Sequence, residues 1–126
     1  MALGRLLLAD KSALERATPE TLELGEICCC AVVRVEMLYS ARSARDYRRI
    51  EEYLDGFRDL RMDAETIATA VSAHKELGER GRQRVPVPDL LIAACAQQYQ
   101  ASVLHVDRHY DTLADVLAFE SVRLTV

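Results

Sequence analysis

The stretch LLLAD, residues 6–10, decides the fold, because an uninterrupted apolar run is followed directly by an acid. Strands that are apolar throughout are buried on both faces, which is typical of a parallel sheet. The run SVLHVD, residues 102–107, repeats this arrangement near the other end of the chain. A third apolar run covers residues 27–31, and residues 121–126 alternate like a final strand. The sequence predicts an α/β fold with a mostly parallel central sheet of about 4–5 strands flanked by helices.

Short helices are expected close to the first strand. Ser12 is expected to cap one that runs toward Arg16, and Thr18 with Pro19 begins another that reaches about Leu24. A longer helix follows the second strand and carries Glu36 near its first turn.

The middle of the chain shows the 3.6-residue period of amphipathic helices. One helix is predicted over residues 44–57, and residues 60–62 are expected to be a short strand or a linker. Asp63 is expected to cap the next helix, with an apolar face made by Ile67, Ala70, Val71, His74 and Leu77. Residues 89–98 are apolar almost all round, which predicts a central helix packed against the sheet.

Composition indicates one soluble globular domain over residues 1–126. Half of the residues are hydrophobic and 29% are charged, which excludes a disordered chain. The longest apolar runs are far shorter than the roughly 20 residues that a membrane-spanning helix needs. Residues 1–9 are too short for a signal peptide, so we expect a cytoplasmic protein.

The four cysteines fit a reducing compartment. Cys28, Cys29 and Cys30 are consecutive, and neighbours in a strand point to opposite faces, so they cannot converge on one zinc ion. We therefore expect them, with Cys95, to be small buried residues.

The basic residues are almost all arginines, and two groups of arginines stand out. The net charge of −4 argues at first against a nucleic-acid partner, because basic surface supplies most of the affinity for phosphates. Arginine is nevertheless the better bidentate partner for phosphate. One group spans residues 42–49, and the other contains Arg80, Arg82 and Arg84 in an exposed loop. Taken alone, both groups are better explained as solvated surface than as an RNA contact.

Four acids are expected at one edge of the sheet, where parallel α/β folds bind their ligands. Asp10 and Asp107 follow strands, Glu36 lies just past the second strand, and Asp89 begins the central helix. Each alone fits a turn or a cap, but converging carboxylates need a counter-cation or shared protons, and a divalent metal is the usual solution. Because all of these ligands are oxygens and His74, His105 and His109 form no evident trio, the set indicates Mg²⁺ or Mn²⁺.

Four segments of the chain resemble, in order, the motifs of PIN-domain ribonucleases, and they are most similar to VapC-type toxins of VapBC toxin-antitoxin systems. The segments are LLLADKSAL, VVRVEMLYSAR, VPVPDLLIAACA and VLHVDRHYD, and together they cover nearly the whole chain. The resemblance implies that Asp10, Glu36, Asp89 and Asp107 are catalytic and bind Mg²⁺, with Asp111 as an additional acid. Ser12 matches a small hydroxyl residue of the first motif, and it would support a ligand or a bound water.

The resemblance implies a Mg²⁺-dependent endoribonuclease that cleaves RNA with a metal-activated water and acts as the toxin of a type II pair. It also implies a homodimer and a VapB-type antitoxin that blocks the acidic groove. Arg80, Arg82 and Arg84 would contact RNA, whereas the helix bearing residues 42–49 would face either RNA or the antitoxin. Lys11 departs from the motif, where Thr or Ser is commoner, and its ammonium group would compete with metal. The alternative is a catalytically inactive PIN-like module that binds RNA or protein.

A phosphate-accepting receiver domain also gathers acids and Mg²⁺ at the strand ends of an α/β sheet. It requires two adjacent acids after the first strand and a lysine after the last-but-one strand. Here Lys11 follows Asp10, and Asp107 stands where the lysine would be, so the sequence argues against this class.

Overall fold

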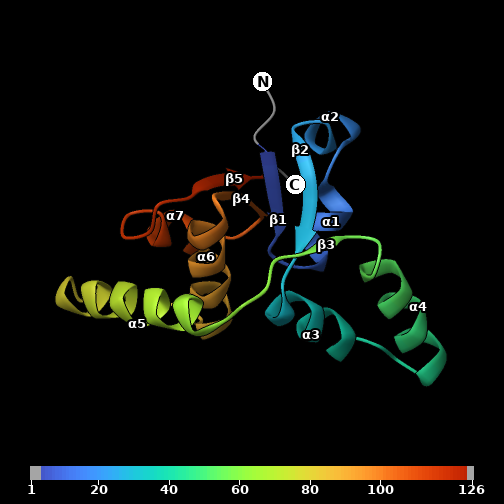
Figure 1. Cartoon of the computed structure of the whole chain (residues 1–126), viewed down its shortest axis with the longest axis horizontal. Helices are drawn as coiled ribbons and strands as arrows, with labels where there is room; N and C mark the ends of the chain where they lie inside the picture. Colours follow the sequence, from blue (N-terminus) through green and yellow to red (C-terminus); the bar gives the residue numbers. More distant parts are fainter. Residues whose placement is uncertain (1–3, 125–126) are drawn as a thin grey trace.

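The computed structural model describes residues 4–124 and contains one five-stranded parallel sheet in the order β3-β2-β1-β4-β5 (Figure 1). The strands are β1 Gly4–Leu8, β2 Gly25–Cys29, β3 Arg58–Asp59, β4 Ala101–His105 and β5 Glu120–Arg123. The helices are α1 Lys11–Arg16, α2 Pro19–Leu22, α3 Ala31–Tyr39, α4 Ala44–Leu54, α5 Ala64–Glu79, α6 Val87–Tyr99 and α7 His109–Leu113. The prediction of an α/β fold with a parallel sheet of this size is confirmed.

The sheet is covered on both faces, as its apolar strands predict. Leu7 and Val103 point into the larger core, which α3, α5, α6 and α7 complete. Leu6, Leu8 and Leu104 point into a smaller core, which α1 covers. Alternate residues of β1 therefore enter different cores, which explains why this strand has no polar position between Leu6 and Leu8.

The first two strands begin at closely approaching glycines. Gly4 is paired with Gly25, and a Cβ atom added to Gly25 would lie only 2.2 Å from the carbonyl oxygen of Gly4. Any side chain at position 25 would therefore push the two strands apart.

Helix α6 forms the centre of the larger core. Residues 92–96 of this helix are completely buried, which confirms the prediction of a central helix. Gln100, in the left-handed conformation, ends α6 and leads directly into β4. The helix therefore runs opposite to the strands, and its first turn lies at the edge where the strands end.

Several local expectations are corrected. The cap of α1 is Asp10 rather than Ser12, since the Asp10 carboxylate accepts a hydrogen bond of 2.8 Å from the Ala13 N–H. The second strand ends at Cys29 because Cys30 is already the N-cap of α3, so Glu36 lies in the second helical turn and not in the first. Helix α4 ends at Leu54, and the short strand lies at Arg58–Asp59 rather than at 60–62.

The predicted apolar face of α5 is also wrong in part. Ile67 and Val71 are 51% and 64% exposed, whereas Thr66 is fully buried beside Ala70 and Leu77. Thr66 completes a capping box with Asp63 and also bonds Gln98 of α6. These polar bonds turn the helix so that Thr66, rather than Ile67, faces the core.

The cysteines behave as expected. All four are buried and free, and burial raises the pKa of Cys29 to about 12, so this thiol stays protonated.

The final strand covers Glu120–Arg123, and residues 125–126 of the expected strand lie outside the described residues. Across residues 4–124, the structure contains no helix with the length and apolar character needed to cross a membrane.

Candidate active site

The strand order creates a crevice between the carboxyl ends of β1 and β4. The chain leaves β1 toward β2 on one side, and it leaves β4 toward β5 on the other. Ligands of open α/β sheets bind at such a reversal, because the two connections diverge there. Asp10 follows β1 and Asp107 follows β4, so these two acids flank the crevice. Glu36 on α3 lines a hollow together with Asp10, and Asp89 lies in the first turn of α6, which begins at the same edge.

One part of this rim, formed by Asp89, Asp107 and His109 and here called the α6–α7 half, is tightly gathered. A carboxylate oxygen of each acid and a ring nitrogen of His109 all lie within 4.8 Å of one another. His109 Nδ1 is 2.9 Å from Asp107 Oδ1 and 3.5 Å from Asp89 Oδ2. Two carboxylates and an imidazole nitrogen therefore face a common point.

Asp89 is held in place from two sides. It lies in the first turn of α6, where the helix dipole favours a negative charge. The buried Tyr110 hydroxyl donates a hydrogen bond of 3.2 Å to Asp89 Oδ1. The pKa of Asp89 is raised, chiefly because the side chain is partly buried. The hydrogen bond from Tyr110 opposes this shift, and the negative charges of Asp107 and Glu36 add to it. The influence of Glu36 and Asp107 on Asp89 indicates that all three carboxylates share one electrostatic environment.

Asp107 is oriented by the chain around it. The backbone N–H of His109 donates a hydrogen bond of 3.0 Å to Asp107 Oδ1. This bond is the main reason that the pKa of the Asp107 carboxyl group is lowered. The backbone N–H of Asp107 in turn donates a hydrogen bond of 3.2 Å to Nδ1 of the buried His105. Because Nδ1 of His105 accepts this bond, its Nε2 carries the proton and donates to the Ser121 hydroxyl on β5. A polar chain from β5 thus fixes the backbone of Asp107.

Asp111 belongs to this support and not to the acidic group. Its oxygens accept from the Ser121 hydroxyl at 3.1 Å and from Arg123 Nη1 at 3.3 Å, both on β5. Asp111 is therefore tied to β5 and is not one of the three residues whose donor atoms converge in the α6–α7 half.

The rest of the rim, formed by Asp10, Lys11 and Glu36 and here called the α1–α3 half, is more open. These residues line a shallow hollow of about 180 Å³, together with Ser12, Met37 and Ser40. Asp10 uses its Oδ1 atom to cap α1. Lys11 Nζ lies 3.8 Å from Glu15 Oε1, so the ammonium group is paired with Glu15 and not with Asp10. Asp10 follows β1 and Asp107 follows β4, and these strands pair side by side in parallel, so the two halves lie at the same edge of the sheet. The four predicted acids are thus at one edge, although only two belong to the tight group.

Sequence reasoning missed His109, which completes the tight group, and Tyr110, which supports Asp89. Both stand directly after the strand-end acid, in the segment DRHYD. His109 shares the turn with Asp107 through its own N–H, and this spacing is the signal that would have found it.

A divalent cation fits the α6–α7 half on chemical grounds. His109 Nδ1 is a buried polar atom with no hydrogen-bond partner of adequate geometry, although it lies close to two carboxylates. A buried polar atom without a partner is costly, and neighbouring carboxylates repel each other by ~4 kcal/mol at about 4 Å and an effective dielectric near 20. A cation bound between these three donors would remove both costs.

The arginines predicted to bind RNA lie around the loop that joins α5 to α6. Arg80 is paired with Glu76 at 2.8 Å, and Arg82 bonds Asp115 and Thr112 at the far end of α7. Arg84 makes no ion pair with any residue between 4 and 124. Of this group, Arg84 keeps its charge uncompensated and lies five positions before Asp89.

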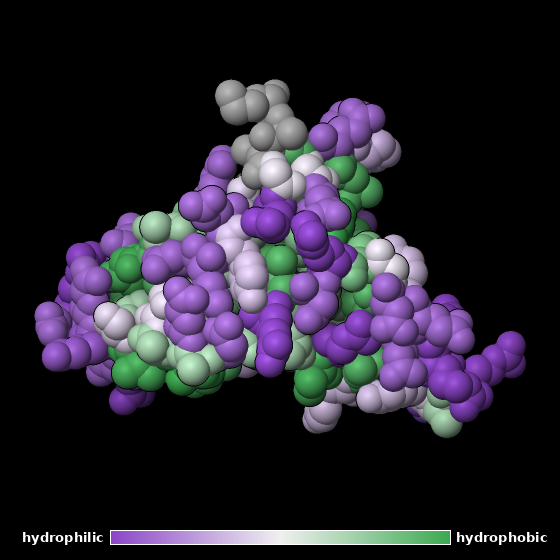
Figure 2. Space-filling view, in the orientation of Figure 1, coloured by the Kyte–Doolittle hydropathy of each residue, from purple (hydrophilic) through white to green (hydrophobic). Residues whose placement is uncertain are grey.

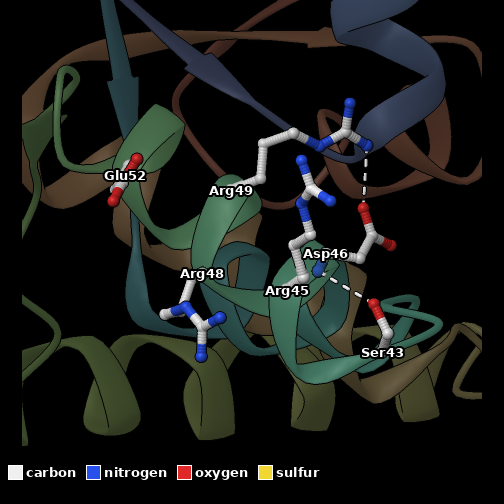
Figure 3. Close-up of a pocket in the computed structure, with 6 residues that line it drawn as sticks. All are labelled: Ser43, Arg45, Asp46, Arg48, Arg49 and Glu52. Carbon is white, nitrogen blue, oxygen red and sulfur yellow. Dashed lines mark hydrogen bonds and ion pairs between the residues drawn. The ribbon is translucent and has the colours of Figure 1, made fainter.

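A second set of arginines forms a stripe along α4. Arg45, Arg48, Arg49 and Glu52 lie at helical spacing and line a surface hollow with Ser43 and Asp46 (Figure 3). Arg49 bonds Asp46 at 2.7 Å, whereas Arg45 and Arg48 have no ion pair within the described part of the chain. Helix α4 contacts α3, so the stripe lies on the helix next to the one that carries Glu36. Figure 2 shows that the surface over α4 is mostly hydrophilic.

Comparisons with known proteins agree with this architecture. The PIN domain family matches residues 3–116. Ribonuclease VapC17 of Mycobacterium tuberculosis is 37% identical over 116 residues, which cover 86% of this chain and 87% of that protein. Ribonuclease VapC18 of the same organism is also 37% identical, over 86% of this chain and 81% of its own length.

Solved structures support the fold. The VapBC2 complex of Rickettsia felis, bound to a DNA fragment from its promoter, gives a TM-score of 0.75 at 16% identity, over 96% of this chain and 99% of that chain. VapBC-5 of Mycobacterium tuberculosis gives a TM-score of 0.68 at 21% identity, with the same coverage. The chain therefore belongs to the PIN domain family, and its relatives within that family include proteins named Ribonuclease VapC.

Proposed function

We propose that this chain is a metal-dependent endoribonuclease that acts as the toxin of a type II toxin-antitoxin pair. The observation that carries the proposal is the convergence of Asp89, Asp107 and His109 at the crevice between β1 and β4. Relatives that are 37% identical and named Ribonuclease VapC support RNA as the substrate class.

Each residue of the rim has a proposed task. Asp89 and Asp107 would hold a divalent cation directly, and Asp10 would bind a water molecule of that cation; we propose Mg²⁺ or Mn²⁺ because the acids offer carboxylate oxygens. The bound cation would activate water and stabilise the leaving oxygen of the cleaved phosphodiester bond. Glu36, across the crevice, would accept a hydrogen bond from the attacking water, and Ser12 would orient a water molecule in the same hollow. Asp111 would act indirectly, by supporting His105 and Asp107.

RNA would reach this acidic rim along basic surface. Arg84 is well suited to a phosphate contact because its charge is uncompensated, while Arg80 and Arg82 would have to exchange exposed ion pairs for phosphates. Such exposed pairs are worth only ~1 kcal/mol or less, so the exchange is affordable. Arg45 and Arg48 offer two more uncompensated charges in the surface hollow along α4 (Figure 3).

The partners follow from the same family relation. Similar solved structures are VapBC complexes, which supports a VapB-type antitoxin that covers the acidic groove. We also propose a homodimer, for which the exposed apolar side chains of Ile67 and Val71 on α5 would supply contact area. A cytoplasmic location would agree with four free cysteines.

Metal removal tests the proposed activity. The purified chain should cut structured RNA in Mg²⁺ or Mn²⁺, stop in EDTA, and resume when the metal is restored in excess. The RNA ends, mapped by sequencing, report where it cuts. Cleavage that continues undiminished in EDTA would contradict a metal-dependent mechanism, and binding of RNA without cleavage in either metal would favour an inactive module.

Expression of the chain alone tests the toxin role. Growth should slow when the active chain is induced, and it should recover when the cognate antitoxin is supplied. Normal growth with intact, folded protein would count against a toxin.

A further inference from the structure

His109 is the one member of the tight group whose ring has no task in the proposed chemistry. Its Nδ1 is buried and lies 2.9 Å from Asp107 Oδ1, yet it makes no hydrogen bond of adequate geometry. That oxygen already accepts a hydrogen bond of 3.0 Å from the backbone N–H of His109. The ring nitrogen and the Asp107 carboxylate are therefore close but poorly aligned for a hydrogen bond, and a cation bound between them would use both as ligands.

The surroundings of the ring restrict what that participant can be. Two carboxylates, Asp89 and Asp107, lie within 3.5 Å of the nitrogen, so an anion would be repelled. Glu36 adds a further negative charge that is felt at Asp89. The position is therefore suited to a cation that accepts nitrogen and oxygen donors together.

We infer that His109 is the third protein ligand of the metal centre and that it gives the centre a preference for first-row transition ions over Mg²⁺. This inference rests on the proposed function, since it concerns the same metal. Mg²⁺ is bound by oxygen donors, whereas an imidazole nitrogen favours the transition series with affinity rising from Mn²⁺ to Co²⁺. The expectation of an all-oxygen site, drawn from the four acids, is thereby replaced by a mixed site.

The preference is measured as a ratio of dissociation constants, without any RNA present. Mn²⁺ binding is followed by electron paramagnetic resonance, Co²⁺ binding by its visible absorption, and Mg²⁺ binding by calorimetry. His109→Phe keeps a ring but removes the nitrogen, and His109→Asn offers an amide oxygen in its place. His74→Asn is the matched control, because His74 lies on α5 and its ring contacts only the Gln83 carbonyl.

We expect His109→Phe to weaken Co²⁺ and Mn²⁺ binding by at least about 10- to 100-fold, the loss that even indirect metal supports cause. Mg²⁺ binding should change far less, so the selectivity ratio falls. His109→Asn should keep Mg²⁺ binding but not the preference for Co²⁺, while His74→Asn should change nothing. The visible spectrum of bound Co²⁺ should also shift in both His109 variants, which a purely structural role of the ring would not cause.

Three outcomes overturn the inference. If both His109 variants keep the wild-type ratio while Asp89→Asn abolishes binding, the metal centre stands and His109 is not a ligand. If His109→Phe binds all three ions more tightly, the ring shields the acids rather than completing the site. If the wild-type chain binds none of the ions, both the inference and the proposed metal-dependent function fail. Circular dichroism of each variant shows whether it is folded.

Discussion

The two halves of the rim differ in how firmly their donors are held. In the α6–α7 half, Asp89 and Asp107 are fixed by a helix N-terminus, a buried tyrosine and the chain from β5. In the α1–α3 half, Asp10 divides its carboxylate between a helix cap and the crevice, and Glu36 lines an open hollow. The difference suggests a division of labour: the rigid half holds a cation, and the open half handles water and substrate.

The largest effect should come from the rigid half. Asp89→Asn keeps the size of the side chain and an oxygen that can accept from Tyr110, but it removes the charge. We expect Mn²⁺ binding and RNA cleavage to fall by at least on the order of 100-fold, because a ligand matters more than the supports around it. Single-turnover cleavage and Mn²⁺ titration measure this, with Asp115→Asn as the control for an exposed acid on the same side of the fold.

The open half should separate binding from chemistry. We expect Glu36→Gln and Asp10→Asn to slow cleavage by about 100-fold, the lower end of the range of a positioned acid or base, while Mn²⁺ affinity falls much less than in Asp89→Asn. Asn is as good an N-cap as Asp, so Asp10→Asn should leave α1 intact. If both variants lose metal as completely as Asp89→Asn does, the two halves act as one site and the division of labour is wrong.

The tyrosine that supports Asp89 offers a smaller, more selective change. Tyr110→Phe removes the hydroxyl that bonds Asp89 but keeps the buried ring. We expect Mn²⁺ affinity to fall by about tenfold and the free energy of unfolding to fall by ~1 kcal/mol. Tyr99→Phe is the control, because its hydroxyl bonds the Arg61 carbonyl, away from the rim. Equal metal affinity in both variants would show that Asp89 does not need this support.

The acids of the rim could be predicted from the sequence because each one follows a recognisable strand or lies on a recognisable helix. Asp10 and Asp107 directly follow apolar runs, and Asp89 opens the one helix that is apolar almost all round. The distances between these acids could not be predicted from the sequence, because they depend on how α6 and α7 pack. Nothing in the periodicity distinguishes Asp89, with its tyrosine and histidine neighbours, from Glu36 in an open hollow.

Polar contacts account for what the sequence pattern missed. Ile67 and Val71 fit a helical period as well as the buried residues do, and only the bonds of Thr66 to Asp63 and Gln98 select the other face. His109 was set aside because no histidine trio was evident, although its partners are carboxylates rather than histidines. In both cases the deciding partner is distant in sequence or of another residue type.

Lys11 tests whether the open half carries a built-in competitor for metal. The sequence suggests competition, because an ammonium group follows Asp10, but its Nζ lies 3.8 Å from Glu15 and the side chain is 61% exposed. Exposed charges interact by only ~1 kcal/mol or less, so we expect Lys11→Thr to change Mn²⁺ affinity by less than about threefold. Lys75→Thr, which removes the only other lysine, controls for net charge. A tenfold tightening in Lys11→Thr alone would mean that the ammonium group swings onto Asp10 in solution, and the open half would then regulate metal entry rather than merely receive substrate.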